Sequence, residues 1–377
     1  MSSRGEADSV SLSQELRDKV GLFEVQNGVF LEILEKQTFK QHRHFRGSLP
    51  HSNGIEPGFD AGPIFTVYAE DGYVDLMAGL TLIGNRVVRE TAVVPKLVAR
   101  YDGVTTAELA AARVSDDSRI VLPLASQRMG NYCRWWLDSV AKIFVTSRSS
   151  ILRQKLRGST WDVVAPELPT AYQRETVKLF DWRPLITSNT TDRLLRGRSV
   201  NSSGLTFGGG QRIGGMVREM ARFLDLLIPP ATNTNPEEIG ELVYISRNEA
   251  SMRRILNEDE LVPGLRKLGF KIVSPGKQSL TQQIETFRNA RVVLAPHGAG
   301  LTNIVFCRPR TTLIEIFPEG GVHGSAFLRI ASHLRFNYYF IVGEKVDTPQ
   351  GLKNPNNSDI VLNVNNVLRF VREAVEA

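Results

Sequence analysis

Cysteine is scarce in this chain, and long apolar runs are missing. The two cysteines, Cys133 and Cys307, are far apart and each lies in an apolar segment. We therefore expect two buried thiols in a reducing compartment, with a single disulfide as the alternative. No segment approaches the roughly 20 apolar residues that a transmembrane helix needs, and the first residues contain no apolar signal core. The sequence predicts a cytoplasmic protein, which leaves open a peripheral contact with the inner face of a membrane.

The sequence also lacks an Asp-x-Asp pair that could hold a divalent cation. The nearest acidic run is Glu258-Asp259-Glu260, which is typical of the first turn of a helix. Three of the six histidines, His42, His44 and His51, lie close together, but no carboxylate or cysteine stands at ligand spacing. A surface loop is the expected interpretation of these histidines, and a metal site is the lesser alternative. We expect no metal and no bound cofactor.

Charge of one sign does not dominate any region. The chain has 377 residues and a formal net charge of +6 that is spread along its length. This length predicts two domains, and the charge favours an anionic ligand or a lipid surface over nucleic acid. The basic run Arg148, Arg153, Lys155 and Arg157 is most simply a solvated helix face, with contact to an anionic membrane as the alternative.

The most informative stretch is residues 291–306, RVVLAPHGAGLTNIVF. An apolar run at 292–295 predicts a buried parallel strand, a turn follows at 296–300, and a helix is expected from Leu301. The first N–H groups of a helix have no internal partner and favour an anion. Gly298 and Gly300 would let a diphosphate approach the backbone without meeting a Cβ atom. His297, at the mouth of the turn, could donate to a phosphate oxygen or take part in the chemistry.

The second half of the chain alternates strands and helices. Strands are expected at 242–246, 271–273, 292–295, 313–317 and 338–342, and helices near 258–268, 280–289, 301–306 and 324–334. This order predicts a parallel sheet covered by helices, with a ligand at the carboxyl ends of the strands. Ser246-Arg247 and Glu315 follow or end two of these strands. We expect Glu315 to contact a ribose, with an ion pair to a nearby arginine as the alternative.

The first half predicts strands at 64–68, 80–83, 119–124 and 161–164, and helices at 129–144 and 170–180. Asn131, Arg134 and Asp138 lie one helical turn apart on one side of the first helix and could form the wall of a site. A plain surface ion pair between Arg134 and Asp138 is the alternative. The glycine- and serine-rich residues 199–215 suggest a linker. We expect an N-terminal α/β domain over 1–204 and a C-terminal Rossmann-like domain over 205–377, whose tail helix within 360–375 could pack back on the first domain.

Several of these segments together resemble one family. The series runs from YISRNEASMRRILNE at 244–258 through LGF at 268–270 and residues 283–290 to HGAGLTN at 297–303, Phe306 and IEI at 314–316. In this order it is similar to glycosyltransferase family 61, several bacterial members of which are described as capsular polysaccharide biosynthesis proteins. The resemblance covers roughly residues 120–345. Asn131-Tyr132 with Asp138 also resembles the family's Asn-Tyr-x-His motif and the acidic residue four places after its histidine.

The resemblance implies an α/β fold of two Rossmann-like domains facing across a cleft (GT-B-like). It implies an inverting hexosyl- or pentosyltransferase that uses a nucleotide sugar, expected to be a UDP-sugar, and a glycan or lipid-linked saccharide acceptor. Asp138 would be the catalytic base, Asn131 and Arg134 would lie on the acceptor side, and Arg247 and Arg254 would be cationic contacts of the donor diphosphate. By matching position, the diphosphate would be lined by His297, Gly298, Ala299, Gly300, Leu301, Thr302 and Asn303.

Two positions depart from the family pattern. Arg134 stands where the family usually has histidine, which leaves open a second function: a binding protein that keeps the donor fold without catalysis. Arg310 stands where a glycine usually follows the proline, and this change is expected to alter only a turn. A third function, a sugar epimerase or dehydrogenase, is disfavoured because the central turn lacks the dinucleotide motif Gly-x-Gly-x-x-Gly.

Overall fold

The fold was analysed in a computed structural model of the whole chain. The residues that it describes are 9–10, 21–26, 28–35, 38–40, 58–60, 64–91, 103–116, 119–126, 128–150, 160–180, 185–187, 193–207, 212–213, 216–228, 241–321 and 326–376. The chain divides into two compact units. Unit 1 comprises Met1–Phe39 and Phe59–Gly215, and unit 2 comprises Lys40–Gly58 and Met216–Ala377.

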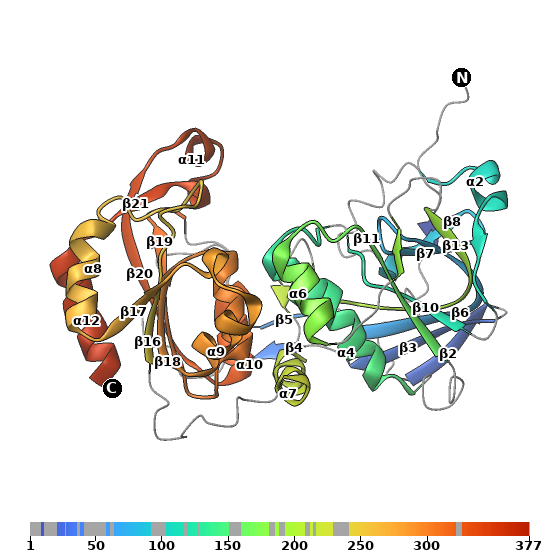
Figure 1. Ribbon diagram of the computed structural model, residues 1–377, viewed down its shortest axis with the longest axis horizontal. Coiled ribbons are helices and arrows are strands. Elements are labelled where there is room, and N and C mark those ends of the chain that lie inside the picture. Colours follow the sequence, from blue (N-terminus) through green and yellow to red (C-terminus); the bar gives the residue numbers. More distant parts are fainter. Residues whose placement is uncertain are drawn as a thin grey trace. The chain divides into compact units, whose positions relative to one another are not determined.

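Unit 2 contains a six-stranded sheet that is parallel over its first five strands (Figure 1). The order is β17 (Phe270–Val273), β16 (Glu241–Ile245), β18 (Ala290–Pro296), β19 (Thr312–Pro318), β20 (Asn337–Val346) and β21 (Asp359–Val361). Only β21 runs antiparallel to its neighbour. The central strands are almost wholly buried, as helices on both faces of a parallel sheet require. The parallel sheet predicted for the second half of the chain is confirmed.

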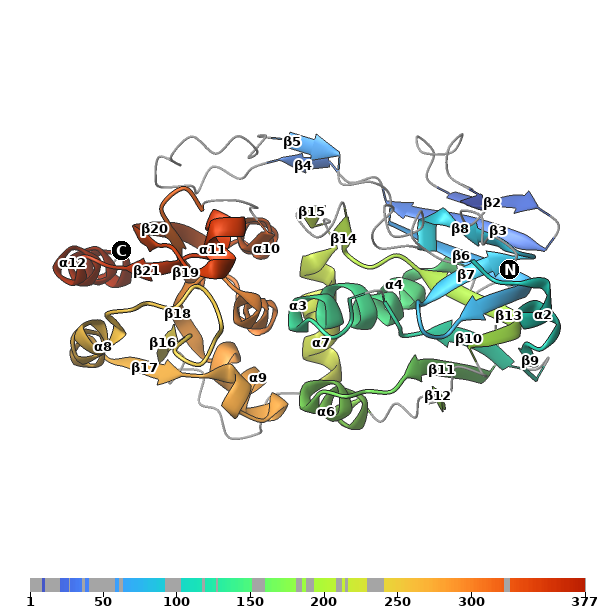
Figure 2. The ribbon, with the colours of Figure 1, turned by 90° about the horizontal axis from the view of Figure 1, so that it is seen from above.

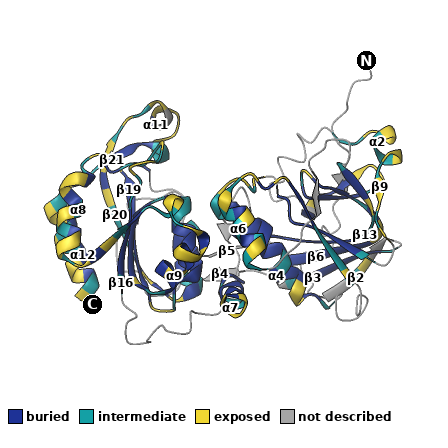
Figure 3. Ribbon diagram, in the orientation of Figure 1, coloured by how far each residue is buried: buried dark blue, intermediate teal, exposed yellow. Residues whose placement is uncertain are grey.

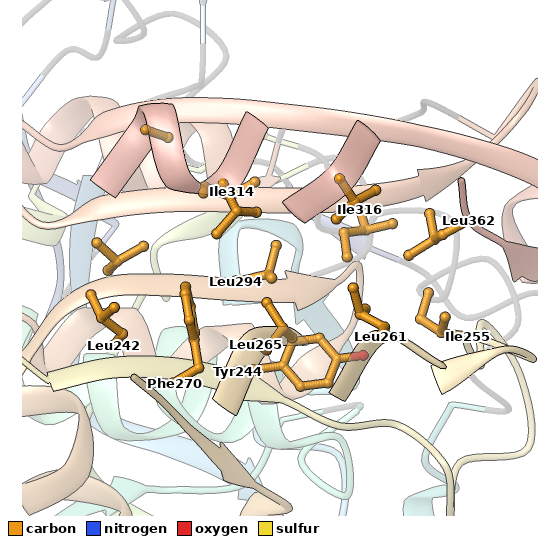
Figure 4. Close-up of a cluster of buried hydrophobic side chains, with 14 of the residues drawn as sticks. Leu242, Tyr244, Ile255, Leu261, Leu265, Phe270, Leu294, Ile314, Ile316 and Leu362 are labelled. Carbon is orange, nitrogen blue, oxygen red and sulfur yellow. The ribbon is translucent and has the colours of Figure 1, made fainter. Parts of the chain in front are cut away.

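Helices cover both faces of this sheet (Figure 2). One face carries α8 (Glu258–Lys267) and α12 (Val364–Glu376), and the other carries α9 (Leu280–Arg288), α10 (Ala326–Leu334), α7 (Val217–Leu227) and the 3₁₀ helix η7 (Ala299–Phe306). The apolar side chains of the first face form one cluster that joins the strands to α8 and to the C-terminal segment (Figure 4). Figure 3 shows the burial of each residue: the strands are mostly buried, and the exposed residues lie on the outer sides of the helices.

The tail helix α12 belongs to this core. Its buried residues Val367, Val371 and Ala374 lie in the cluster that also holds Leu261 and Leu265 of α8. The apolar stripe of the tail helix is thus buried within unit 2, and a further contact of this helix with the first domain stays a prediction.

The strand order places a topological switch point between β16 and β18. The chain leaves β16 through α8 to reach β17 on one side, and then crosses through α9 to β18 on the other side. Consecutive connections therefore diverge at the carboxyl ends of β16 and β18, where ligands bind in open α/β sheets.

Unit 1 has a mixed sheet of eleven strands. Its parallel part consists of β13 (Leu194–Ser202), β10 (Arg119–Pro123), β11 (Thr160–Pro166) and β12 (Leu185–Thr187). Beyond β13 the pairing turns antiparallel, through β6 (Ile64–Asp75) to β3 (Val29–Glu35), β2 (Gly21–Gln26), β7 (Leu80–Ile83) and β8 (Arg86–Val88). Unit 1 is therefore an α/β unit, but not the second doubly wound Rossmann-like domain that the resemblance implied.

The predicted linker includes the end of a central strand. Ser199, Asn201 and Ser202 are polar but buried in β13, and the side chains of Asn201 and Ser202 form hydrogen bonds in the interior. Asn201 Nδ2 donates to Gly79 O at 2.9 Å, and Ser202 Oγ lies 2.7 Å from Thr146 Oγ1. Hydrogen bonding of this kind removes the cost of burying polar groups. The linker prediction is wrong for this part, because a polar composition was mistaken for an exposed segment.

One helical segment of unit 1 changes its winding along its length. It runs from α3 (Tyr132–Arg134) through the π-helical segment η2 (Trp135–Val140) into α4 (Ala141–Arg148), which packs on β13 and β6. π-Helical turns of this kind are rare and frequently occur at functional sites. The helix predicted at 129–144 is confirmed, with the π segment as an unforeseen feature, and α6 (Ala171–Leu179) confirms the helix predicted at 170–180.

The remaining described elements are short. They are β1 (Ser9–Val10), β4 (Thr38–Lys40), β5 (Gly58–Asp60), η1 (Arg89–Thr91), α2 (Thr106–Ala110), β9 (Arg113–Val114), β14 (Thr206–Phe207), β15 (Arg212–Ile213), η6 (Pro275–Lys277), α11 (Pro349–Lys353) and η8 (Pro355–Asn357). Within the described residues, none of the helices has the length and apolarity required to traverse a bilayer. Both cysteines are free thiols, but only Cys307 is buried as expected, whereas Cys133 is half-buried. Burial raises the pKa of the Cys307 thiol far above its ordinary value.

Arg310 allows a test of backbone strain. Its φ of 73° lies in the left-handed region, which costs a non-glycine residue about 1–2 kcal/mol. We expect Arg310→Gly to raise the free energy of unfolding by about 0.5–1 kcal/mol, because the strain relieved exceeds the entropy that glycine adds to the unfolded chain. Denaturant titration measures the change. Arg308→Gly, at a neighbouring position that is not left-handed, is the control and should lower stability; an equal loss for both variants would refute the prediction.

Candidate functional site

The residues that follow β16 and β18 meet at the switch point of unit 2. The two strands pair in parallel, with Tyr244 opposite Leu294, so Arg247 and the turn at His297–Gly298 leave the same edge of the sheet. A Cβ atom added at Gly298 would lie 2.1 Å from Arg247 Nη1. Gly298 has an extended backbone with a φ of 167°, so the glycine matters for space: a side chain there would require the Arg247 guanidinium to move. At Gly300 an added Cβ would meet Ile245 at an ordinary 3.6 Å, so the structure shows no such packing requirement there.

The predicted helix after the turn is present as the 3₁₀ helix η7, closed at its start by a hydrogen bond from Leu301 N to Gly298 O. Leu301, Thr302 and Asn303 are buried. The Asn303 amide donates to Gln283 Oε1 at 3.0 Å and to Gly300 O at 3.1 Å, which ties the turn to α9. Thr302 Oγ1 is a buried atom with no hydrogen-bond partner among the described residues. A diphosphate at this turn would therefore meet the backbone from Gly298 to Gly300, including Ala299, before these side chains.

His297 and Glu315 form a fixed pair. His297 Nδ1 lies 2.5 Å from Glu315 Oε1, and Tyr338 donates its hydroxyl to Glu315 Oε2 at 2.7 Å. The imidazole stacks on Phe317 with ring centroids 5.4 Å apart, and its side chain is 21% exposed. Burial, followed by the effect of Glu315, raises the pKa of Tyr338 well above its ordinary value. Glu315 and Phe317 therefore hold the imidazole ring of His297 in place. The other ring nitrogen, Nε2, forms no hydrogen bond with a described residue.

Glu315 has a different environment from the one predicted. Its carboxylate is 1% exposed, and both of its oxygens have partners. In this structure it orients His297; a direct contact with a ribose stays a prediction.

Two half-buried arginines, Arg247 and Arg253, lie at this edge of the sheet. Arg247 donates through Nη2 to Met252 O at 3.1 Å, whereas the Nε atoms of Arg247 and Arg253 have no hydrogen-bond partner in the part of the chain that the structure describes. Burial lowers the pKa of Arg247 to about 10; the nearby Arg253 adds to this effect and Asp359 opposes it. Burial also lowers the pKa of Arg253, and Glu315 opposes that shift. Neither guanidinium forms an ion pair with a carboxylate of the described residues.

Arg253 is a residue that the sequence analysis missed. It holds a left-handed backbone with a φ of 58°, and such strain in a non-glycine residue is concentrated at functional sites. Its neighbour Arg254, predicted as the donor contact, forms an ion pair with Asp359 at 2.6 Å and is 43% exposed. In the sequence the two arginines are adjacent and equivalent, and nothing in that pattern indicates which of them faces the site.

The predicted catalytic carboxylate lies in unit 1. Asp138 sits in the π-helical segment with no exposed surface. Its Oδ2 lies 3.2 Å from Arg134 Nη1, and its Oδ1 accepts a hydrogen bond from the Thr206 hydroxyl. Burial raises the pKa of Asp138, and Arg134 is the main opposing influence. The ion pair has the i,i+4 spacing of the surface pair considered as an alternative, but it is buried.

Two further residues complete this helical region. Asn131, predicted on the acceptor side, is the N-cap of α3, where its side chain accepts from Cys133 N at 3.0 Å and from Arg134 N at 3.3 Å. Lys142, missed by the sequence analysis, is 1% exposed and donates to Ala125 O at 2.7 Å. Burial lowers the pKa of Lys142 to about 7.

Some predicted features cannot be placed. His42, His44 and His51 lie outside the described residues, as do Arg153, Lys155 and Arg157 of the basic run. Within the described ranges, no three His, Cys, Asp or Glu side chains group as a metal site requires. The expectation of a metal-free protein stays a prediction.

Comparison with known proteins gives a family match that includes this site. Residues 132–314 match the family model described as Glycosyltransferase 61. An alpha-1,3-arabinosyltransferase of Oryza sativa subsp. japonica is 36% identical over 91 residues, which is 23% of this chain and 15% of that protein. The EGF domain-specific O-linked N-acetylglucosamine transferase of Drosophila melanogaster is 32% identical over 85 residues, covering 22% and 16%.

A beta-1,2-xylosyltransferase of Arabidopsis thaliana is 34% identical over 76 residues, covering 17% of this chain and 14% of that protein. The matched region thus spans about 15% of the length of these relatives. The region of this chain that matches the glycosyltransferase 61 family model, residues 132–314, includes Arg247, Arg253, His297 and the turn at Gly298.

Proposed function

We propose that this chain is a glycosyltransferase that moves a sugar from a nucleotide sugar to a hydroxyl group of a glycan or glycoconjugate, with inversion and without a divalent metal. The observation that carries the proposal is the pair Arg247 and Arg253, two half-buried arginines whose Nε atoms are buried and which have no carboxylate partner among the described residues. They accompany the Gly298 turn at the switch point of a parallel sheet, where such folds bind ligands.

An anion at this place would supply the missing negative charge. The diphosphate of a nucleotide sugar, with a UDP-sugar as the expected form, carries that charge and gains more as the bond to the sugar breaks. Guanidinium groups match phosphate oxygens through bidentate hydrogen bonds, and preorganised positive groups act more strongly in a desolvated site than in water. The two arginines would thus perform the charge stabilisation that a divalent cation performs in other enzymes.

His297 is the residue best placed to take part in the transfer itself. In the reaction the acceptor oxygen bonds to the anomeric carbon, the bond from that carbon to the diphosphate breaks, and the acceptor proton passes to a base. With Nδ1 held by Glu315, a protonated imidazole would donate from Nε2 to the leaving phosphate oxygen. Glu315 would serve as the counter-charge and as the residue that fixes the ring.

A second candidate function rests on the surroundings of Asp138. This predicted base has no exposed surface and pairs with Arg134, which stands where the family motif has histidine. Because its charge is paired inside the protein, a structural role is favoured for Asp138. If it has only that role, the chain would be a binding protein that keeps the donor site without transferring the sugar. Hydrolysis of the donor in the absence of acceptor separates the two functions, since a pure binding protein should show none.

Several finer expectations rest on the resemblance or on the charge alone. They are the cleft-facing GT-B arrangement, a role in surface or capsular polysaccharide synthesis, a lipid-linked acceptor, a cytoplasmic location and contact with an anionic membrane. Each of these stays a prediction.

The first test concerns the arginines. We expect Arg247→Ala and Arg253→Ala each to weaken UDP binding by roughly 10–100-fold, because a hydrogen bond to a charged group contributes about 1.5–3 kcal/mol. Isothermal titration calorimetry measures the affinity. Arg266→Ala removes an exposed arginine of α8 and serves as the control, with unchanged binding expected. Equal affinities for all four proteins would refute the donor site.

The second test separates chemistry from structure. We expect His297→Ala to lower the rate of transfer by about 10²–10⁴-fold, the range of a positioned acid or base, with little change in the unfolding midpoint. Asp138→Asn should instead lower stability by about 3–5 kcal/mol, because it leaves the buried Arg134 charge without its partner. Initial rates and denaturant titrations measure both effects. A stable Asp138→Asn variant that binds UDP but transfers no sugar would restore Asp138 as the base.

The third test concerns metal. We expect transfer to continue at an unchanged rate in excess chelator, because Arg247 and Arg253 supply the positive charge at the diphosphate. The rate is compared with and without chelator, and after addition of Mg²⁺ or Mn²⁺. Strict dependence on either cation would rule out the metal-independent mechanism.

A further inference from the structure

The C-terminal strand β21 is bound to the loop that carries Arg253. This loop, residues 246–257, connects β16 to α8 and lies within the region matched by the family. β21 begins at Asp359 and lies outside that region. Ile255 and Ile360 form a parallel bridge, and both side chains are buried in the same apolar cluster. The two segments are therefore one packed structure, although about 100 residues separate them along the chain.

Backbone hydrogen bonds hold the loop on the C-terminal side of Arg253. Arg254 N donates to Asp359 Oδ1 at 2.9 Å, and Ile360 N donates to Arg254 O at 2.8 Å. Two residues further along the chain, Leu256 N donates to Ile360 O at 2.8 Å. The Asn257 amide group also exchanges two hydrogen bonds with the backbone of Leu362. Both polar backbone groups of the residue after Arg253 are thus fixed by β21.

The loop is also held on the N-terminal side of Arg253. Met252 O accepts a hydrogen bond from Arg247 Nη2 at 3.1 Å. Arg253 therefore lies between two anchored residues, and this explains how it retains a left-handed backbone. Strained conformations of this kind persist only where the surrounding structure fixes them.

Asp359 is the residue on which these contacts converge. Its carboxylate is 1% exposed, binds Arg254 N, and forms an ion pair with the Arg254 guanidinium at 2.6 Å. β21 is seated tightly against β20, since a Cβ atom added at Gly343 would lie 2.4 Å from Ile360 Cγ2. The carboxylate of Asp359 also favours the charged form of the half-buried Arg247.

We infer that Asp359 is a positioning residue for the phosphate-binding arginines: through Arg254 it fixes the loop that presents Arg253 to the donor diphosphate. The role of Arg254 follows from the same geometry, because its guanidinium faces Asp359 and holds the loop. This inference rests on the proposed function for its ligand, but the attachment of the loop to β21 is independent of that ligand.

The test measures UDP and uridine binding to Asp359→Ala and to Asp359→Asn, which keeps an acceptor for Arg254 N. A positioning role predicts that Asp359→Ala weakens UDP binding by about tenfold, the size of effect seen when a supporting partner of a binding group is removed, and leaves uridine binding unchanged. Asp359→Asn should show a smaller loss. Asp347→Ala is the control, because Asp347 is an exposed residue whose carboxylate pairs with Lys345.

A double-mutant cycle with Arg253→Ala tests whether Asp359 acts through Arg253. Once Arg253 is absent, Asp359→Ala should cause little further loss of UDP affinity, whereas additive losses would overturn the inference. Equal losses for uridine and UDP would also overturn it, because they would indicate a general disturbance of the fold.

Hydrogen exchange provides a measurement that needs no ligand. Amide protection at residues 252–257 should fall in Asp359→Ala and stay unchanged in Asp347→Ala. If the wild-type chain bound no nucleoside diphosphate, the proposed function would fail, and the exchange result alone would decide whether Asp359 fixes the loop. If the wild-type chain bound UDP and Asp359→Ala bound it equally well, the inference would fail while the function stood.

Discussion

Unit 2 partly buries two positive charges without pairing them with a carboxylate of the described residues. Arg247 and Arg253 lie at the carboxyl edge of a parallel sheet, and neither forms an ion pair with a carboxylate of the described residues. Burying a charge is costly unless a partner compensates for it, and the pKa of Arg247 falls to about 10 for this reason. Both groups nevertheless keep their proton at neutral pH. Under the proposed function, an anion bound between the two arginines would recover part of the free energy lost on burial, and this would favour binding of a diphosphate.

The surrounding structure keeps these charges in place. Gly298 leaves room for the Arg247 guanidinium, and Met252 O accepts one of its hydrogen bonds. Glu315 is close enough to influence Arg253, yet its oxygens are occupied by His297 and Tyr338. The acid is thus bound to the imidazole and cannot neutralise the arginines by direct contact. An arrangement of this kind preorganises the site before a ligand arrives.

In unit 1, by contrast, a buried positive charge is paired with a buried carboxylate. Arg134 and Asp138 pair with each other inside the protein, and the Thr206 hydroxyl supplies a further hydrogen bond. Such a pair is compensated internally and has little capacity left for a ligand. The residues that resemble the family's catalytic motif thus form a buried, internally paired ion pair, whereas Arg247 and Arg253 lie at the candidate site without such a partner among the described residues.

The sequence by itself determined the parallel sheet of unit 2, the turn at residues 296–300 and the resemblance to the family, because apolar runs and glycine positions are local signals. It did not reveal β13, whose buried polar side chains resemble those of a linker, or the π-helical segment around Asp138. Only the tertiary structure decided that Arg253 faces the site while Arg254 faces Asp359, and that the tail helix packs within unit 2. Adjacent arginines have the same local pattern, and their directions are fixed by contacts with residues about 100 positions away. Long-range contacts of this kind leave no periodic signal in a single sequence.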